Sequence, residues 1–164
     1  MPLNLTPEAL RAHDVNGPRY TSYPTADRFV EAFGEADYTN ALRVARSTGP
    51  GAARPLSIYV HIPYCEQLCY YCACNKIVTR HKSRGAEYLA LLKAELALHL
   101  AELAKTGSGR HAVSQLHLGG GTPTFLSDEE LSELMAALKA GFELVPGGEY
   151  AIEIDPRTVT RERL

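Results

Sequence analysis

The residues with the clearest chemical meaning are the cysteines. All four lie in one short stretch, as Cys65, Cys69, Cys72 and Cys74. A disulfide framework spreads its cysteines to join distant segments, so this crowding favours a metal or cluster site. The first three have the spacing C-x3-C-x2-C. Three thiolates on one loop can ligate three irons of a cubane and leave the fourth iron open to a substrate or cofactor.

A structural zinc site is the main alternative. Zinc usually takes a closed tetrahedral set of four ligands, often from two separated CxxC-type pairs. Here only one residue separates Cys72 from Cys74, and no second pair follows. The residues therefore favour an iron–sulfur cluster and leave zinc and inert thiols open. Cys74 is a spare thiol, a packed thiol or a local functional group.

The expected secondary structure places the cysteine loop directly after a strand. Strands are predicted at Leu56–Ile62, 113–118 and 150–154, and a helix at 84–104. A second helix opens at Ser127, where Glu130 completes a capping box. The helices have apolar faces formed by Leu89, Leu92, Leu96, Leu100 and Leu103, and by Leu131, Leu134, Met135, Leu138 and Phe142.

This alternation predicts an α/β fold with parallel strands and helices packed outside. A closed eight-stranded barrel needs roughly 200 residues or more. The 164 residues hold three strand–helix units, so we expect an incomplete parallel (β/α) barrel, truncated after its N-terminal part. We assign residues 55–164 to the barrel and 1–54 to an N-terminal extension. In the extension, helices are expected from Thr6-Pro7 and over 37–46, and residues 160–164 are expected to begin another helix.

A Gly-rich segment, Gly119 to Thr122, separates the second strand from the next helix. It matches neither common nucleotide-binding glycine pattern. It is either a tight turn or a place where a ligand approaches the main chain and pairs with free N–H and C=O groups.

Two other side chains are candidates because of their strand positions. Alternation puts Glu153 on the opposite face from Ile152 and Ile154, and a carboxylate pointing into a barrel is costly unless it is paired or used. It is either a functional group or the partner of a buried Arg or Lys. Tyr59 shares a face with His61 and could equally be a packed core residue.

Composition excludes several classes of function. The net charge is -2, and like charges form no long run, so nothing indicates nucleic-acid binding. Neither a secretory signal nor a membrane span is evident. We expect a cytoplasmic protein, a monomer, with no membrane or nucleic-acid partner.

The cysteine loop, with Tyr71 just before its third cysteine, resembles the radical S-adenosylmethionine (SAM) superfamily. More narrowly, the chain resembles the oxygen-independent coproporphyrinogen III oxidases of heme synthesis. The matching segments are PRYTSYPTA (18–26), YVHIP (59–63), CACNK (72–76), GGGTPT (119–124) and IEIDP (152–156).

The resemblance implies an oxidoreductase that decarboxylates two propionates of coproporphyrinogen III to the vinyl groups of protoporphyrinogen IX. A [4Fe–4S] cluster on Cys65, Cys69 and Cys72 would cleave SAM to a 5′-deoxyadenosyl radical, with an electron donor that the sequence does not identify. The positions implied to contact SAM are Tyr59, Tyr71, Gly120, Gly121, Thr122 and Glu153.

Further implications concern a second ligand and the substrate. Gly121 and Thr122 are the positions that would touch a second SAM. Arg19, Tyr20 and Tyr23 either contact the acidic tetrapyrrole or form an ordered wrapping segment. A related heme-binding chaperone without oxidase activity and a zinc-stabilised interaction domain are the alternative functions.

Overall fold

The computed structural model describes residues 6–14, 28–47, 54–107 and 109–163. The chain divides into two compact units, Met1–Asp37 and Tyr38–Leu164. The predicted division at residues 54/55 stays a prediction. In the first unit, helix α1 (Pro7–His13) begins as expected, because Thr6 is its N-cap and accepts a hydrogen bond from the Ala9 N–H at 3.2 Å.

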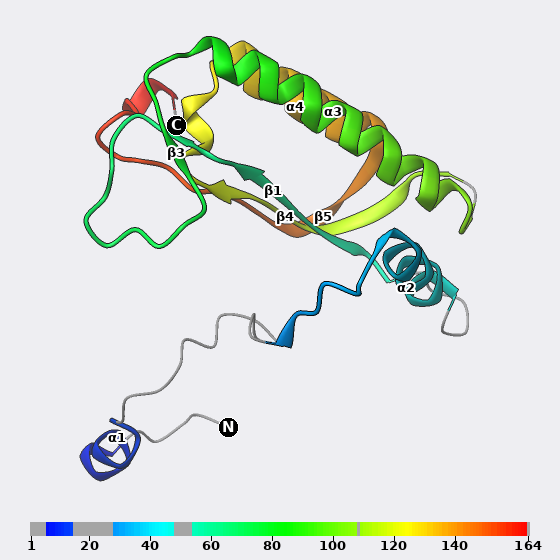
Figure 1. The fold of residues 1–164 in the computed structure, drawn as a ribbon, viewed down its shortest axis with the longest axis horizontal. Coiled ribbons are helices and arrows are strands. Elements are labelled where there is room, and N and C mark those ends of the chain that lie inside the picture. The colour runs from blue at the N-terminus through cyan, green and yellow to red at the C-terminus, as the bar shows by residue number, and fades with distance from the viewer. Residues whose placement is uncertain (1–5, 15–27, 48–53, 108, 164) are drawn as a thin grey trace. The chain divides into compact units, whose positions relative to one another are not determined.

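The second unit contains a parallel three-stranded sheet. Its strands β1 (Leu56–Ile62), β4 (His111–Gly120) and β5 (Phe142–Ile152) lie in the order β1-β4-β5. Helices α3 (Ser83–Ala104) and α4 (Asp128–Gly141) pack side by side on one face of the sheet (Figure 1). The predicted α/β fold with a partial parallel sheet is therefore confirmed.

The helices bury one face of the sheet because the apolar residues recur with the expected periods. Val60 and Ile62 of β1 are buried against Leu89 and Leu103 of α3 and the apolar side of α4. The capping box of Ser127 and Glu130 is present at the start of α4. Because strand side chains alternate, Tyr59 and His61 lie on the other face, which the helices do not cover.

Several element boundaries differ from those expected. β4 continues through Gly119 to Gly120, and β5 begins at Phe142, which was assigned to the preceding helix. The chain turns at Gly141, where a Cβ would lie 2.7 Å from Leu100. β5 ends at Ile152, so Glu153 follows the strand, although its N–H still donates to the Leu118 C=O at 2.9 Å.

Three short or peripheral elements lie outside this core. Helix α2 (Glu35–Ser47) covers the range predicted at 37–46, and η2 (Pro123–Phe125) is a short 3-10 helix before α4. The expected final helix is only the 3-10 turn η3 (Arg161–Arg163). Within the described ranges, no helix is long and apolar enough to cross a bilayer.

Candidate functional site

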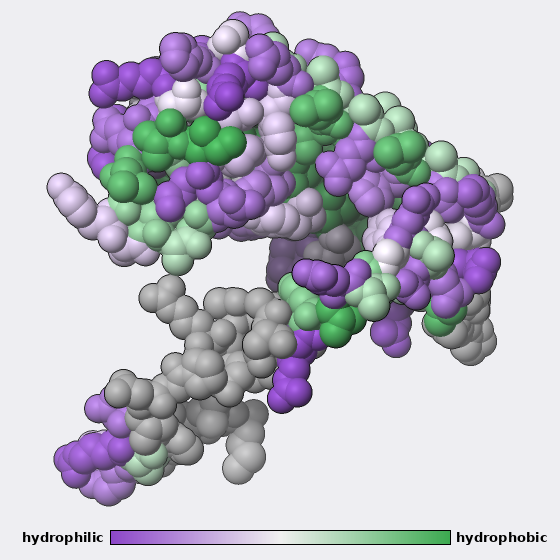
Figure 2. Space-filling view, in the orientation of Figure 1, coloured by the Kyte–Doolittle hydropathy of each residue, from purple (hydrophilic) through white to green (hydrophobic). Residues whose placement is uncertain are grey.

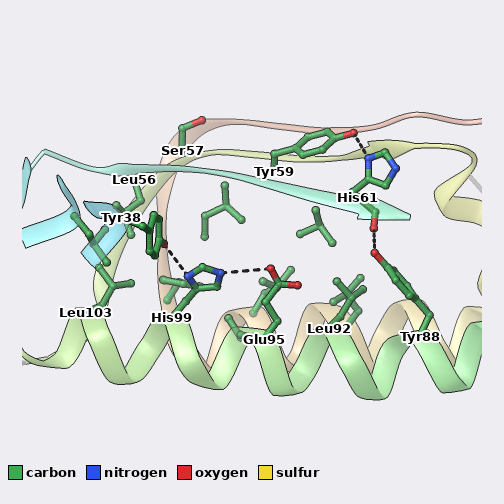
Figure 3. Close-up of a pocket in the computed structure, with 17 residues that line it drawn as sticks. Tyr38, Leu56, Ser57, Tyr59, His61, Tyr88, Leu92, Glu95, His99 and Leu103 are labelled. Carbon is green, nitrogen blue, oxygen red and sulfur yellow. Dashed lines mark hydrogen bonds and ion pairs between the residues drawn. The ribbon is translucent and has the colours of Figure 1, made fainter. Parts of the chain in front are cut away.

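The uncovered face of the sheet holds a connected group of polar side chains at the carboxyl end of β1. The Tyr59 hydroxyl and Nδ1 of His61 are 3.0 Å apart (Figure 3). The parallel register pairs Tyr59 with His117 on β4, and their rings stack at 5.7 Å with an interplanar angle of 13°. Alternation along β1 thus correctly predicted that Tyr59 and His61 share a face.

Glu153 joins this group from the end of β5. One carboxylate oxygen lies 3.2 Å from His117 Nε2, and the other accepts a hydrogen bond from the Gly120 N–H at 3.0 Å. Its partners are therefore a histidine and a main-chain amide rather than a buried Arg or Lys. Burial raises the pKa of Tyr59, and the negative charges of Glu153 and Cys74 raise it further, so its hydroxyl stays protonated at neutral pH.

The Gly-rich segment links this polar group to the cysteine loop. Gly120 has φ +106°, and a Cβ there would lie 2.6 Å from the His61 ring. The N–H groups of Gly121 and Thr122 donate to the C=O groups of Ile62 and Tyr64, both at 2.8 Å. Because the Gly120 N–H is bound to Glu153, all three amides are already paired within the chain. The contact of this segment with a ligand stays a prediction.

The cysteine loop is closed at its base by a two-residue ladder. Strand β2 (Tyr64–Cys65) pairs with β3 (Ile77–Val78), and the Thr79 N–H donates to the Cys65 C=O at 2.9 Å. The buried Cys65 sulfur accepts a hydrogen bond from the Thr122 hydroxyl at 3.5 Å. The first cysteine is thus attached directly to the Gly-rich segment.

The other three cysteines lie further out on the loop. Cys69 Sγ accepts a hydrogen bond from Nη2 of Arg157 at 3.3 Å, and the Cys72 N–H donates to the Cys69 C=O at 3.1 Å. A main-chain hydrogen bond from Cys74 lowers the pKa of Cys72, with help from Lys76. Burial and the interaction with Cys72 raise the pKa of Cys74. Cys72 therefore has more thiolate character than Cys74.

The donor set fits an iron–sulfur cluster by its chemistry. All four cysteines are free thiols, and a Cβ on Gly121 would lie 3.0 Å from Cys65 Sγ and 2.8 Å from the Tyr64 C=O, so only glycine permits this close approach. In the described part of the chain, no three Cys, His, Asp or Glu side chains already converge on one metal position. Ligation would therefore require rearrangement of the loop.

Not every predicted site residue joins this group. Tyr59, Gly120, Gly121, Thr122, Glu153 and Cys65 are linked through the contacts above. Tyr71 is 89% exposed and projects into solvent. Exposed apolar side chains continue along the loop at Leu68, Ile77 and Val78, and Figure 2 shows an apolar area where β3 lies in Figure 1. Arg19, Tyr20 and Tyr23 lie outside the described residues.

Sequence reasoning missed three residues of the site: His61, His117 and Arg157. The sequence alone indicates no functional role for any of the three. His117 can be recognised only from its position opposite Tyr59, and that position follows from the register of the two strands. Arg157 hydrogen bonds to Asp155, whose side chain caps the turn by accepting from the Arg157 N–H at 3.0 Å. This hydrogen bonding and charge lower the pKa of Asp155 and raise that of Arg157.

One cavity of the described part of the chain is lined by residues other than the cysteines. It measures about 560 Å³ and lies between β1 and α3 (Figure 3). Its walls are mainly apolar, and at one side the Tyr38 hydroxyl lies 2.8 Å from His99 Nδ1. The Tyr88 hydroxyl donates to the His61 C=O at 2.9 Å, which fixes the end of β1 next to the cavity.

Known proteins match this chain over most of its length. Residues 59–164 match the family model of the radical SAM superfamily, and this superfamily uses a [4Fe–4S] cluster and SAM. An oxygen-independent coproporphyrinogen III oxidase from Pseudomonas aeruginosa is 49% identical over 92% of this chain and 31% of the relative. One from Mannheimia haemolytica is 40% identical over 90% of this chain and 93% of the relative.

A solved structure agrees with these relatives. Coproporphyrinogen III oxidase from Escherichia coli, a radical SAM enzyme, superposes with a TM-score of 0.74 and 42% identity over 93% of this chain. The match covers 31% of that enzyme, so the chain spans about a third of the length of most relatives named here. The chain belongs to the radical SAM superfamily and, within it, to the oxygen-independent coproporphyrinogen III oxidases.

Proposed function

We propose that this chain supplies the cluster-binding and SAM-binding part of an enzyme that oxidatively decarboxylates coproporphyrinogen III to protoporphyrinogen IX. The observation that carries the proposal is the connection from Cys65 through the Gly-rich segment to Glu153, Tyr59 and His117. It joins the predicted cluster loop to the predicted SAM residues at the carboxyl ends of parallel strands. Ligand sites of parallel α/β folds are built at these ends.

Cys65, Cys69 and Cys72 are the proposed ligands of the [4Fe–4S] cluster. With three protein ligands, one iron stays available to SAM, and the bound cofactors supply the radical that removes hydrogen from a propionate side chain. The chain holds the cysteine loop through β2 and β3 and approaches Cys65 closely at Gly121. Cys74 is proposed not to be a ligand, because it lies outside the C-x3-C-x2-C spacing.

Tyr59, Gly120, Gly121, Thr122 and Glu153 are the proposed SAM contacts on the uncovered face. The Glu153 carboxylate is 51% exposed and is held by His117 and the Gly120 amide. It is thus fixed in direction while it remains open to a cationic group such as an amino group or sulfonium.

Tyr71 is the proposed contact to adenine. Its exposed ring is available for stacking, and reaching the other contacts requires movement of the loop. A second SAM would lie against Gly121 and Thr122. Arg19, Tyr20 and Tyr23 are proposed to contact the tetrapyrrole, whose carboxylates suit Arg pairing.

The test is turnover by the full-length protein after anaerobic assembly of the cluster. With a low-potential reductant, SAM and coproporphyrinogen III, we expect protoporphyrinogen IX and 5′-deoxyadenosine. Glu153→Gln should keep the iron content and lose at least tenfold in SAM affinity, because it removes a charged hydrogen-bonding partner. Stable heme binding by wild type, without SAM-dependent decarboxylation, would instead identify a heme chaperone.

A further inference from the structure

Arg157 is a cationic side chain that contacts Cys69, one of the proposed cluster ligands. It lies in the turn after β5, and its Nη2 donates to Cys69 Sγ at 3.3 Å, across 88 positions of sequence. No role was predicted for it. The contact places a permanent positive charge and an N–H donor at the sulfur of the middle cysteine.

Asp155 fixes the direction of this guanidinium. Arg157 Nε lies 2.9 Å from Asp155 Oδ1, and Nη2 lies 2.7 Å from Oδ2, so two donors of one planar group face one carboxylate. The Asp155 side chain is only 12% exposed, and its C=O accepts from the Thr158 N–H at 3.0 Å. The main chain of Asp155 is thus fixed by its own turn, and the Asp155 carboxylate in turn fixes the Arg157 guanidinium.

Resting on the proposed function, we propose that Arg157 is a positioning residue that orients Cys69 and stabilises the reduced state of the cluster. Reduction adds one negative charge to the iron–sulfur group. N–H donors and positive charge at a ligand sulfur stabilise that more negative state, and hydrogen bonds to sulfur are among the factors that set the potential. Asp155 supplies the orientation, because the same Nη2 group contacts both its carboxylate and the sulfur.

The experiment is an anaerobic redox titration of the reconstituted full-length protein without SAM, followed by electron paramagnetic resonance. We expect Arg157→Met to have a lower midpoint potential than wild type at equal iron content. Removal of the cation also leaves the Asp155 charge uncompensated, which shifts the potential in the same direction. Arg157→Lys keeps the positive charge but loses the paired N–H donors of the guanidinium, so its midpoint potential should lie between those of wild type and Arg157→Met.

Arg161→Met is the matched control, because Arg161 is an exposed arginine in the same segment. It should have the wild-type potential. If Arg157→Met and Arg157→Lys both load iron and titrate like this control, the inference is wrong. If wild type itself assembles no four-iron cluster, the proposed function fails instead, so the two failures are distinguishable.

Discussion

His117 connects the two side chains that alternation along strands had marked as candidates. Its ring stacks on Tyr59, and its Nε2 lies 3.2 Å from the Glu153 carboxylate. Removing it would leave the Glu153 side chain with one fewer partner and the Tyr59 ring without support on that side. Its expected role is to position the SAM contacts, rather than to contact SAM.

His117→Phe tests this role, because phenylalanine keeps the stacking ring and loses the hydrogen bond. A hydrogen bond to a charged group contributes about 1.5–3 kcal/mol, so the Kd for SAM should rise roughly tenfold or more. The measurement is SAM binding to the reconstituted protein. Gln115→Ala is the control, since Gln115 lies two positions earlier on the same face and contacts Glu149 instead. Unchanged SAM affinity in His117→Phe would contradict the assigned role.

Local pattern was enough to find most of the candidate residues but not their partners. The cysteine spacing and the shared face of Tyr59 and His61 depend only on neighbouring positions. His117 becomes visible only when the register pairs β1 with β4, and Arg157 only when the turn after β5 is placed beside the cysteine loop. For Tyr71, the sequence position predicts a contact in the site, whereas the structure leaves its ring exposed to solvent.

At the scale of elements, two main-chain segments approach each other closely where the chain leaves β4. A Cβ on Gly121 would lie 2.8 Å from the Tyr64 C=O and 2.9 Å from the Pro63 carbonyl carbon, and neither group is a flexible side chain. The strand end and the cysteine loop can therefore meet only through glycine at this position.

Gly121→Ala should consequently force the cysteine loop away from β4. We expect destabilisation of about 1–3 kcal/mol, as for overpacking in a filled core, together with reduced iron loading. Thermal unfolding of the apo protein and iron content after reconstitution measure the two effects. Gly107→Ala is the control, because nothing lies within 4 Å of a Cβ there. Equal unfolding stability and equal iron content of Gly121→Ala and Gly107→Ala would contradict a close contact at Gly121.

The capping box is the second element-scale device that can be tested. Ser127→Ala removes the side-chain acceptor of the Glu130 N–H and should cost about 1 kcal/mol of unfolding free energy. Chemical denaturation measures it, with Ser83→Ala at the exposed first residue of α3 as control. A smaller loss in Ser127→Ala than in the control would contradict the assigned cap.

Element types followed from periodicity, whereas the boundaries of the last strand did not. The leucine faces and caps of α3 and α4 are local signals and were predicted. In the sequence, Phe142 continues the apolar pattern of the preceding helix, so the pattern predicts that the helix includes it. The structure ends α4 at Gly141 and begins β5 at Phe142. The register then shifts between Val113↔Leu144 and Gln115↔Glu149, and this irregularity around Gly147 and Gly148 separates the two parts of the strand.

At the scale of the whole molecule, α3 and α4 cover one face of the three parallel strands and, among the described residues, leave the polar face exposed. Tyr59 is 56% exposed on that face, although radical chemistry requires a site from which water is excluded. Residues 1–164 alone should therefore assemble a cluster but show no decarboxylation. The assay is chromatographic detection of protoporphyrinogen IX, with the Pseudomonas aeruginosa relative as positive control. Turnover by residues 1–164 at a rate comparable to that relative would contradict this expectation.

Anaerobic reconstitution with iron and sulfide tests most directly whether three cysteines of this protein hold a four-iron cluster. Visible absorption and iron counting should show about four irons in wild type and in Cys74→Ala, and loss of the cluster in Cys65→Ala. A colourless protein that binds zinc and needs all four cysteines would contradict the account and identify a structural metal site instead.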